Sequence, residues 1–268
     1  MLTGVYTAKK KDGSVYYRSN ITYHGKHISL GSYATQDEAH CAYLAADEIL
    51  HTPVPLSPDL FRCYSILSFD KIVSLCNFRD NHIYIGNPIY LQKSFFTYYL
   101  SPGEELKFDI DDLFFFSGHR ILQRQGHLYV NDYGMQISLL SRYGIKNYAV
   151  LNRDYRFVNG DPMDFRYSNL EIISKYNGVT AVSGNNGIRY RASIHIQGVY
   201  KVGIFDSEAE AAVAYNKAVD LAIAAKVHKN FSQNYILEYT AQEYADLYTK
   251  IKLSPKYLAY LKKLSQQS

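Results

Sequence analysis

Tryptophan is absent from the 268-residue chain, and only three cysteines occur. Cys41, Cys63 and Cys76 form no C-x-x-C pair, and their odd number argues against a disulfide framework or a zinc knuckle. There is no apolar run of about 18 residues and no apolar signal-peptide core near the N-terminus, so neither membrane insertion nor secretion is expected. These absences predict a reducing, cytoplasmic location, at the nucleoid if the cell is bacterial.

The composition is that of a folded protein with room for three small domains. Hydrophobic residues make up 47% of the chain and charged residues 20%, which argues against long disorder. The net charge of +4 permits nucleic-acid binding without proving it, so the distribution of charge matters more than its total.

Two stretches, residues 4–50 and 178–231, are divergent copies of one unit. Aligning Tyr17-Arg18 with Tyr190-Arg191 matches Gly25 with Gly198 and brings Gly4 near Gly178. After a one-residue gap, Gly31 matches Gly203 and Glu38 matches Glu210.

In the later copy, residues 189–197 alternate with a period of two, as in a strand with one buried face. The apolar positions are Tyr190, Ala192, Ile194 and Ile196. A glycine turn and a second strand follow, and Asp206 or Ser207 would cap a helix over 208–225 that carries a stripe of small residues. Each copy therefore predicts three antiparallel strands and one helix, with the polar sheet face uncovered.

The polar faces of these sheets supply candidate DNA contacts. Arginine can read guanine and asparagine can read adenine, while lysine holds phosphates. The lysines at 9–11 would contact phosphate, although a solvated turn would have the same sequence. The candidates are Lys9, Lys10, Arg18, Asn20, Thr22 and Lys26 in the first copy, and Arg189, Arg191, Ser193, His195 and Lys201 in the second.

The repeated unit resembles the Apetala-two, or ethylene-response-factor, type of DNA-binding domain. The residues that carry the resemblance are 178–179, 189–194, 202–205, 208–216 and 230–231 in the second copy, and 4–5, 17–21, 30–33 and 37–43 in the first. That family commonly places tryptophan on its DNA face, and this chain has none. The resemblance implies a sheet that enters the major groove of double-stranded DNA.

Residues 155–172 resemble the core of the His-Asn-His (HNH) nuclease family. The matching framework is Val158, Asn159, Gly160, Asp164, Arg166, Ser168, Asn169 and Leu170. Where that family has a general-base histidine and a positioning asparagine, this chain has Phe157 and Phe165, and Leu140 lies near the place of a metal-binding histidine. Phenylalanine can neither take a proton nor bind a metal. We therefore expect no catalytic residue, no metal, no cofactor and no enzyme activity.

Other groups that could rebuild an active site are few. A cap or a solvated turn explains them better than a metal site, because no ligand pair has helical spacing. The candidates are Asp109, Asp111, Asp112, His119 and His127.

The predicted fold class is α+β, with two small units of three strands and a helix flanking a ββα HNH-like module. The expected domains are residues 1–56 (first DNA-binding unit), 57–80 (helical linker), 81–176 (degenerate HNH-like module), 177–235 (second unit) and 236–268 (helical basic tail). Ser57 would cap a helix that reaches about Cys76, two short strands are expected in 83–91 around a Gly-Asn turn, and a hairpin is expected within 128–139. In the tail, a capping box at Thr240 and the pair Ser254-Pro255 each predict the start of a helix. The tail could clamp DNA, pack on the middle module or mediate a homodimer.

The predicted function is sequence-specific binding of double-stranded DNA by a transcriptional regulator that reads the major groove with two β-sheets. Two alternatives remain open. One is an HNH-type homing endonuclease with divergent catalytic residues. The other is a structural or protein-interaction module, because any exposed antiparallel sheet has one polar face.

Overall fold

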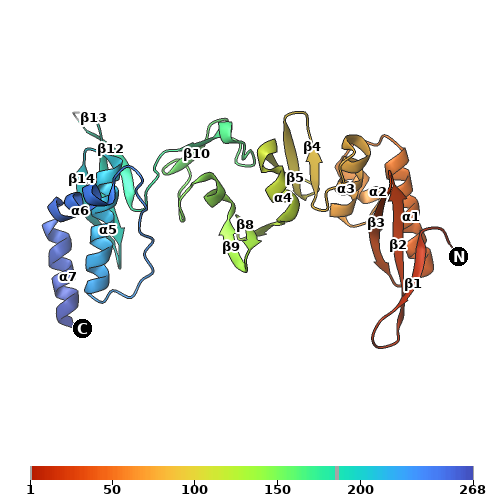
Figure 1. Ribbon diagram of the computed structural model, residues 1–268, viewed down its shortest axis with the longest axis horizontal. Coiled ribbons are helices and arrows are strands. Elements are labelled where there is room, and N and C mark those ends of the chain that lie inside the picture. Colours follow the sequence, from red (N-terminus) through yellow and green to blue (C-terminus); the bar gives the residue numbers. More distant parts are fainter. Residues whose placement is uncertain (1, 185–186, 268) are drawn as a thin grey trace. The chain divides into compact units, whose positions relative to one another are not determined.

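The computed structural model describes residues 2–184 and 187–267 and has the predicted α+β architecture. These residues form two compact units, one made of 2–139 with 161–169 and the other of 140–160 with 170–267. Both units contain small three-stranded antiparallel sheets (Figure 1). In the described part of the chain, no helix combines the length and apolar character needed to cross a membrane.

The first repeat is a three-stranded sheet with one helix. Its elements are β1 (Val5–Lys9), β2 (Val15–Tyr23), β3 (Lys26–Tyr33) and α1 (Gln36–His51). The strands pair in sequence order, and buried Ile21, Ile28 and Leu30 share a hydrophobic core with α1. Thr35 and Glu38 close a capping box at the start of this helix. The alternation of β2 is therefore as predicted, with Ser19 and Ile21 buried and Arg18 and Thr22 exposed.

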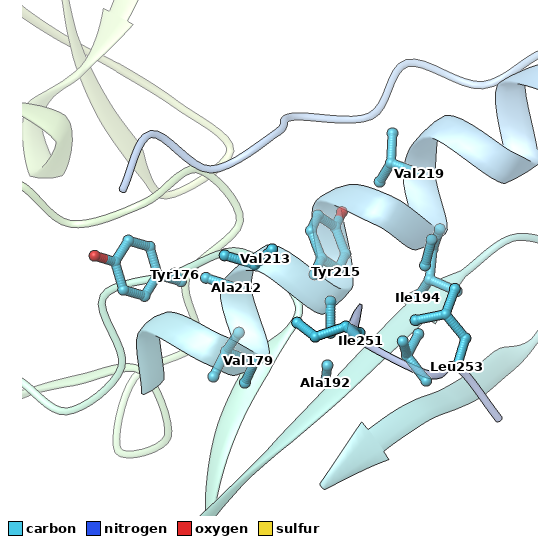
Figure 2. Packing of buried hydrophobic residues seen from close by; sticks show 14 of the residues in the cluster. Tyr176, Val179, Ala192, Ile194, Ala212, Val213, Tyr215, Val219, Ile251 and Leu253 are labelled. Atoms are coloured by element: carbon cyan, nitrogen blue, oxygen red, sulfur yellow. The ribbon is translucent and has the colours of Figure 1, made fainter. Parts of the chain in front are cut away.

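The second repeat has the same order of elements. They are β12 (Val179–Gly184), β13 (Gly187–His195), β14 (Val199–Phe205) and α5 (Glu208–Ala224). Ser207 caps α5, and Ala192, Ile194 and Val202 are buried in one core with its small residues. Figure 2 shows Ala192 and Ile194 in this core. Each sheet has a register shift at an equivalent point, between Ser19 and Asn20 in one and between Ala192 and Ser193 in the other. The two copies inferred from sequence thus share the position of this register shift as well as the order of their elements.

A glycine holds the first strand of each repeat against its helix. Gly4 and Gly178 have φ of 76° and 70°, and each contacts a helix tyrosine, Tyr43 or Tyr215, so closely that a Cβ would overlap the ring. The carbonyl of Gly4 accepts a 2.9 Å hydrogen bond from the Asn20 amide, and that of Gly178 accepts one of 2.7 Å from the next strand. Only glycine both adopts a positive φ at low cost and leaves room for the tyrosine ring, because it has no Cβ.

The segment after the first repeat was expected to be one helix reaching about Cys76, which is wrong. It forms two helices, α2 (Pro58–Cys63) and α3 (Phe69–Asn81), because the chain turns at Tyr64 and buries Leu67. Helix α3 packs into the core of the first repeat. Arg79 on α3 donates hydrogen bonds of 2.8–3.0 Å to three carbonyl groups at and after the end of α1, which ties the two helices together.

The next part of the first unit contains two more sheets. They comprise β4 (Ile89–Leu91), β5 (Phe95–Ser101) and β6 (Glu104–Asp109), then α4 (Leu113–Gly118), then β7 (Ile121–Arg124), β8 (His127–Asp132) and β9 (Met135–Ser138). The hairpin predicted within 128–139 is confirmed as β8 and β9. The strand predicted at 83–85 is not formed, because side chains of α3 bond this backbone instead. Asn77 donates to the Ile83 carbonyl at 2.7 Å.

The ββα arrangement expected for an HNH-like module is not confirmed. Strands β10 (Tyr155–Phe157) and β11 (Leu170–Ile172) pair antiparallel in the second unit. Described residues 139–178 contain only short 3-10 turns as helical structure. The stretch that carries the resemblance is divided, since 161–169 belongs to the first unit.

The C-terminal tail packs on the second repeat, a position that was not among those considered. Helices α6 (Ala241–Lys250) and α7 (Pro255–Gln267) begin where the sequence predicts, the former with a capping box at Thr240. Ile251, Leu253 and Tyr257 are buried in the same cluster as β13 and α5 (Figure 2). The Tyr257 hydroxyl donates a 2.6 Å hydrogen bond to the carbonyl of Ala218 in α5, so the tail is part of that core.

Replacing Gly4 with alanine should destabilise the first unit more than the same change at Gly25. Both have similar φ, 76° and 74°, but a Cβ meets no atom within 4 Å at Gly25. We expect a loss of about 1 kcal/mol at Gly25, from the left-handed backbone alone. At Gly4 the clash with Tyr43 should raise the loss to roughly 2–4 kcal/mol. Denaturant unfolding measures both, and equal losses would contradict the close packing.

Candidate nucleic-acid interface

The sheet face away from α1 carries polar side chains from neighbouring strands. Arg18 lies between Tyr6 and Ser32 in the cross-strand register, and Asn20 lies opposite Ser29. Thr22 pairs with His27, and the Thr22 Oγ1 lies 3.3 Å from the imidazole Nδ1. These residues are exposed or half-buried, so three of the first-copy candidates share one open face.

Arg18 is held in place on this face by an aromatic neighbour. Its Nη2 donates a 2.8 Å hydrogen bond to the Tyr16 hydroxyl, and its Cζ lies 5.5 Å from the centre of the same ring. A positioned guanidinium loses less side-chain entropy on binding. Tyr16 was not among the sequence candidates, although β2 begins at Val15 and strand alternation places Tyr16 on the same face as Arg18.

Lys9 and Lys26 do not share the open face with Arg18. Lys26 pairs with Tyr23 on the helix side of the sheet, and its Nζ lies 5.7 Å from the ring centre of Tyr84. Strand alternation puts Lys9 on the side of buried Val5. Both lysines are exposed, so they flank the open face but do not lie on it.

Lys10 lies in the turn between β1 and β2, and this turn also contains a carboxylate. Asp12 accepts hydrogen bonds from the Ser14 hydroxyl at 2.6 Å and from its amide at 2.9 Å. The bond from the Ser14 hydroxyl lowers the pKa of Asp12 below its usual value, and the bond from the amide lowers it further. An ionised carboxylate therefore stands among the lysines of the turn and reduces its net positive charge.

On the second sheet, all five candidates lie on the face away from α5. Arg191 stands between Thr180 and Ile204, and Ser193 is opposite Lys201. Arg189 and His195 occupy the same side by alternation along β13. Arg191 is the equivalent of Arg18 in the repeat.

Some cations of the second face are paired with other protein groups, and others are not. Arg189 donates from Nε to the carboxylate of Asp206 at 2.8 Å. Lys229 approaches His195, with its Nζ 2.9 Å from the ring Nδ1 and 2.8 Å from the main-chain carbonyl. Arg191 and Lys201 form no hydrogen bond or ion pair with any described residue. These two are the cations most available to a ligand.

The charge of each repeat is segregated between its sheet and its helix. None of the six strands, as the structure bounds them, contains Asp or Glu, while they carry three arginines and three lysines. Helices α1 and α5 carry most of the carboxylates, beginning with Asp37 and Glu38 in α1 and Glu208 and Glu210 in α5, while Asp12 and Asp206 lie outside the strands and helices. Each repeat therefore presents a cationic sheet and an acidic helix.

Phe165, one of the residues that replace HNH catalytic groups, serves packing. Phe165 is 4% exposed and its ring lies 5.6 Å from that of Phe108, within a group of aromatic rings in the first unit. The neighbouring Asp164 is fully buried and receives two hydrogen bonds from the Arg166 guanidinium, at 2.6 and 2.8 Å. Asn169 donates to the Asp164 carbonyl at 2.8 Å. Three residues of the matching framework, Asp164, Arg166 and Asn169, thus bond to one another within 161–169.

Three of the other candidate groups, Asp109, Asp112 and His119, make structural contacts. Asp109 accepts a 2.7 Å hydrogen bond from the Tyr167 amide, and His119 stacks on Phe115 with 4.1 Å between ring centres. Within the described ranges, no group of three His, Cys, Asp or Glu side chains is placed to hold a metal ion.

No family model, curated protein or solved structure matches this chain.

Proposed function

We propose that the protein is a sequence-specific double-stranded DNA-binding protein that acts as a transcriptional regulator. Each Apetala-two-like unit places the open face of its sheet in the major groove, with Arg18 or Arg191 directed at base edges. A major groove about 12 Å wide accepts a small sheet, and arginine is the usual reader of guanine.

One observation carries the proposal: the two sheets lack carboxylates in all six strands and present equivalent arginines on their open faces. A carboxylate on such a face would repel phosphates, and its absence from both copies favours a polyanionic partner. The acidic helices lie on the opposite sides, so each repeat would be oriented with its sheet toward DNA.

Two readers on one chain gain affinity from linkage. Once one sheet is bound, the other searches at an effective concentration set by the intervening chain, which is in the millimolar range for short flexible connections. Each sheet can therefore bind weakly alone while the full chain binds tightly. The HNH-like stretch contributes no chemistry in this proposal.

Binding to duplex DNA should weaken steeply with salt. Neutralising about four to eight phosphates gives a log-log slope of roughly −4 to −7 between affinity and salt concentration. Fluorescence anisotropy with a duplex selected from random sequence measures it. A slope near zero, or no binding to any duplex, would refute the proposal.

Arg191→Ala should relax sequence preference as well as reduce affinity, since Arg191 is uncommitted on the open face. We expect a loss of about 1–3 kcal/mol confined to one base pair of the site. Arg189→Ala should cost less, because Asp206 already neutralises Arg189. Arg62→Ala, at an exposed helix position away from the sheets, controls for net charge. Equal weakening on every sequence would assign Arg191 to phosphate and contradict its role as a reader.

The protein should not cut DNA in the presence of magnesium, manganese or zinc. Phe157 and Phe165 stand where the related nucleases need a base and a positioning amide, and losing such groups costs orders of magnitude in rate. Supercoiled plasmid carrying the selected site is the substrate. Metal-dependent nicking that is lost on Asp109→Ala or Asp111→Ala would reinstate the endonuclease.

A further inference from the structure

The segment between α6 and α7 is attached to the exposed edge of β14. The Ser254 amide donates a 2.8 Å hydrogen bond to the Val202 carbonyl, so the segment continues the bonding of the sheet. Lys217 of α5 donates to the Ile251 carbonyl at 2.8 Å and to the Tyr248 carbonyl at 2.6 Å. The backbone of the segment between α6 and α7 is therefore held by β14 on one side and by α5 on the other.

This attachment turns alternate side chains in opposite directions. Ile251, Leu253 and Tyr257 enter the core of the second repeat, and the first two are labelled beside Ile194 and Ala192 in Figure 2. Lys252 and Lys256 are exposed between them. The apolar anchors thus hold two lysines on the surface at the edge of the sheet.

Lys252 and Lys256 line a groove of about 780 Å³ together with Lys201 of the open face. The floor of the groove is the edge of β14, from Val202 to Phe205, and its described lining contains no carboxylate. None of the three lysines forms an ion pair with a described residue. Three uncompensated ammonium groups along one groove would favour a ligand with a row of negative charges.

We infer that this groove is a clamp for the phosphodiester backbone of duplex DNA and that it makes the second repeat the tighter of the two binding units. The inference rests on the proposed function and adds the tail to it. While the sheet occupies the major groove, Lys252 and Lys256 hold the strand that borders it. Lysine suits this role, because it neutralises phosphate without reading sequence. At the position equivalent to Lys201, the first repeat has Ser29.

The test compares two double variants of the full chain that lose the same charge. Lys252→Gln with Lys256→Gln removes the clamp, and Lys262→Gln with Lys263→Gln removes two exposed lysines farther along α7. Affinity for the selected duplex is measured from 50 to 200 mM salt. The clamp variant should lose about 1.8 from the magnitude of the salt slope, at about 0.9 per phosphate. Its affinity deficit should therefore shrink roughly tenfold across that range.

The control variant should keep a slope close to that of the native chain, and Lys252→Arg with Lys256→Arg should restore it. Base preference should be the same in all four proteins. A native slope in the clamp variant, or an equal fall in the control, would overturn the clamp while leaving DNA binding intact. A native chain that binds no duplex would instead refute the proposed function. Thermal unfolding confirms that each variant is folded.

Discussion

The close approach of one helix to one sheet is the constraint on which both repeats depend. Alanines make it possible, with Ala42 and Ala46 facing the first sheet and Ala211, Ala212 and Ala218 facing the second. At this distance, glycine is required where β1 and β12 begin, because Tyr43 and Tyr215 occupy the space of a Cβ. One helix can cover only one face of a three-stranded sheet. The opposite face is then free to carry residues chosen for binding.

This arrangement separates the demands of stability from those of recognition. Arg18 and Arg191 lie outside the alanine-lined cores, so substitutions there leave the packing of helix on sheet unchanged. The register shift that both sheets share is likewise at other residues. Surface residues of this kind usually contribute little to stability. In the proposed function, their charge would act on DNA, because cationic faces without carboxylates raise the local concentration of a polyanion. The acidic helices would repel DNA on the other side of each repeat and so favour the same orientation.

Features coded by local pattern were predictable from the sequence, and features set by distant contacts were not. The alternation in β2 and β13, the caps at Ser207 and Thr240 and the alanine stripe of α5 each depend on neighbours within a few residues. The side of the sheet taken by Lys26 depends on its pairing with Tyr23 across the turn, and the break at Tyr64 depends on burial of Leu67. The alternation of Ile251, Lys252 and Leu253 is only three residues long, which is too short to indicate from sequence that this segment enters the core of the second repeat. The HNH-like stretch shows the same limit, because its motif lies in two units.

We propose that the open faces of the two sheets contact duplex DNA. Photo-cross-linking tests this contact most directly: a duplex carrying 5-bromouracil in the selected site is irradiated with the bound chain, and the linked peptides are identified by mass spectrometry. We expect cross-links within β1–β3 and β12–β14, with some in the segment around Lys252. Cross-links confined to α1 and α5, or to strands β4–β11, would contradict it.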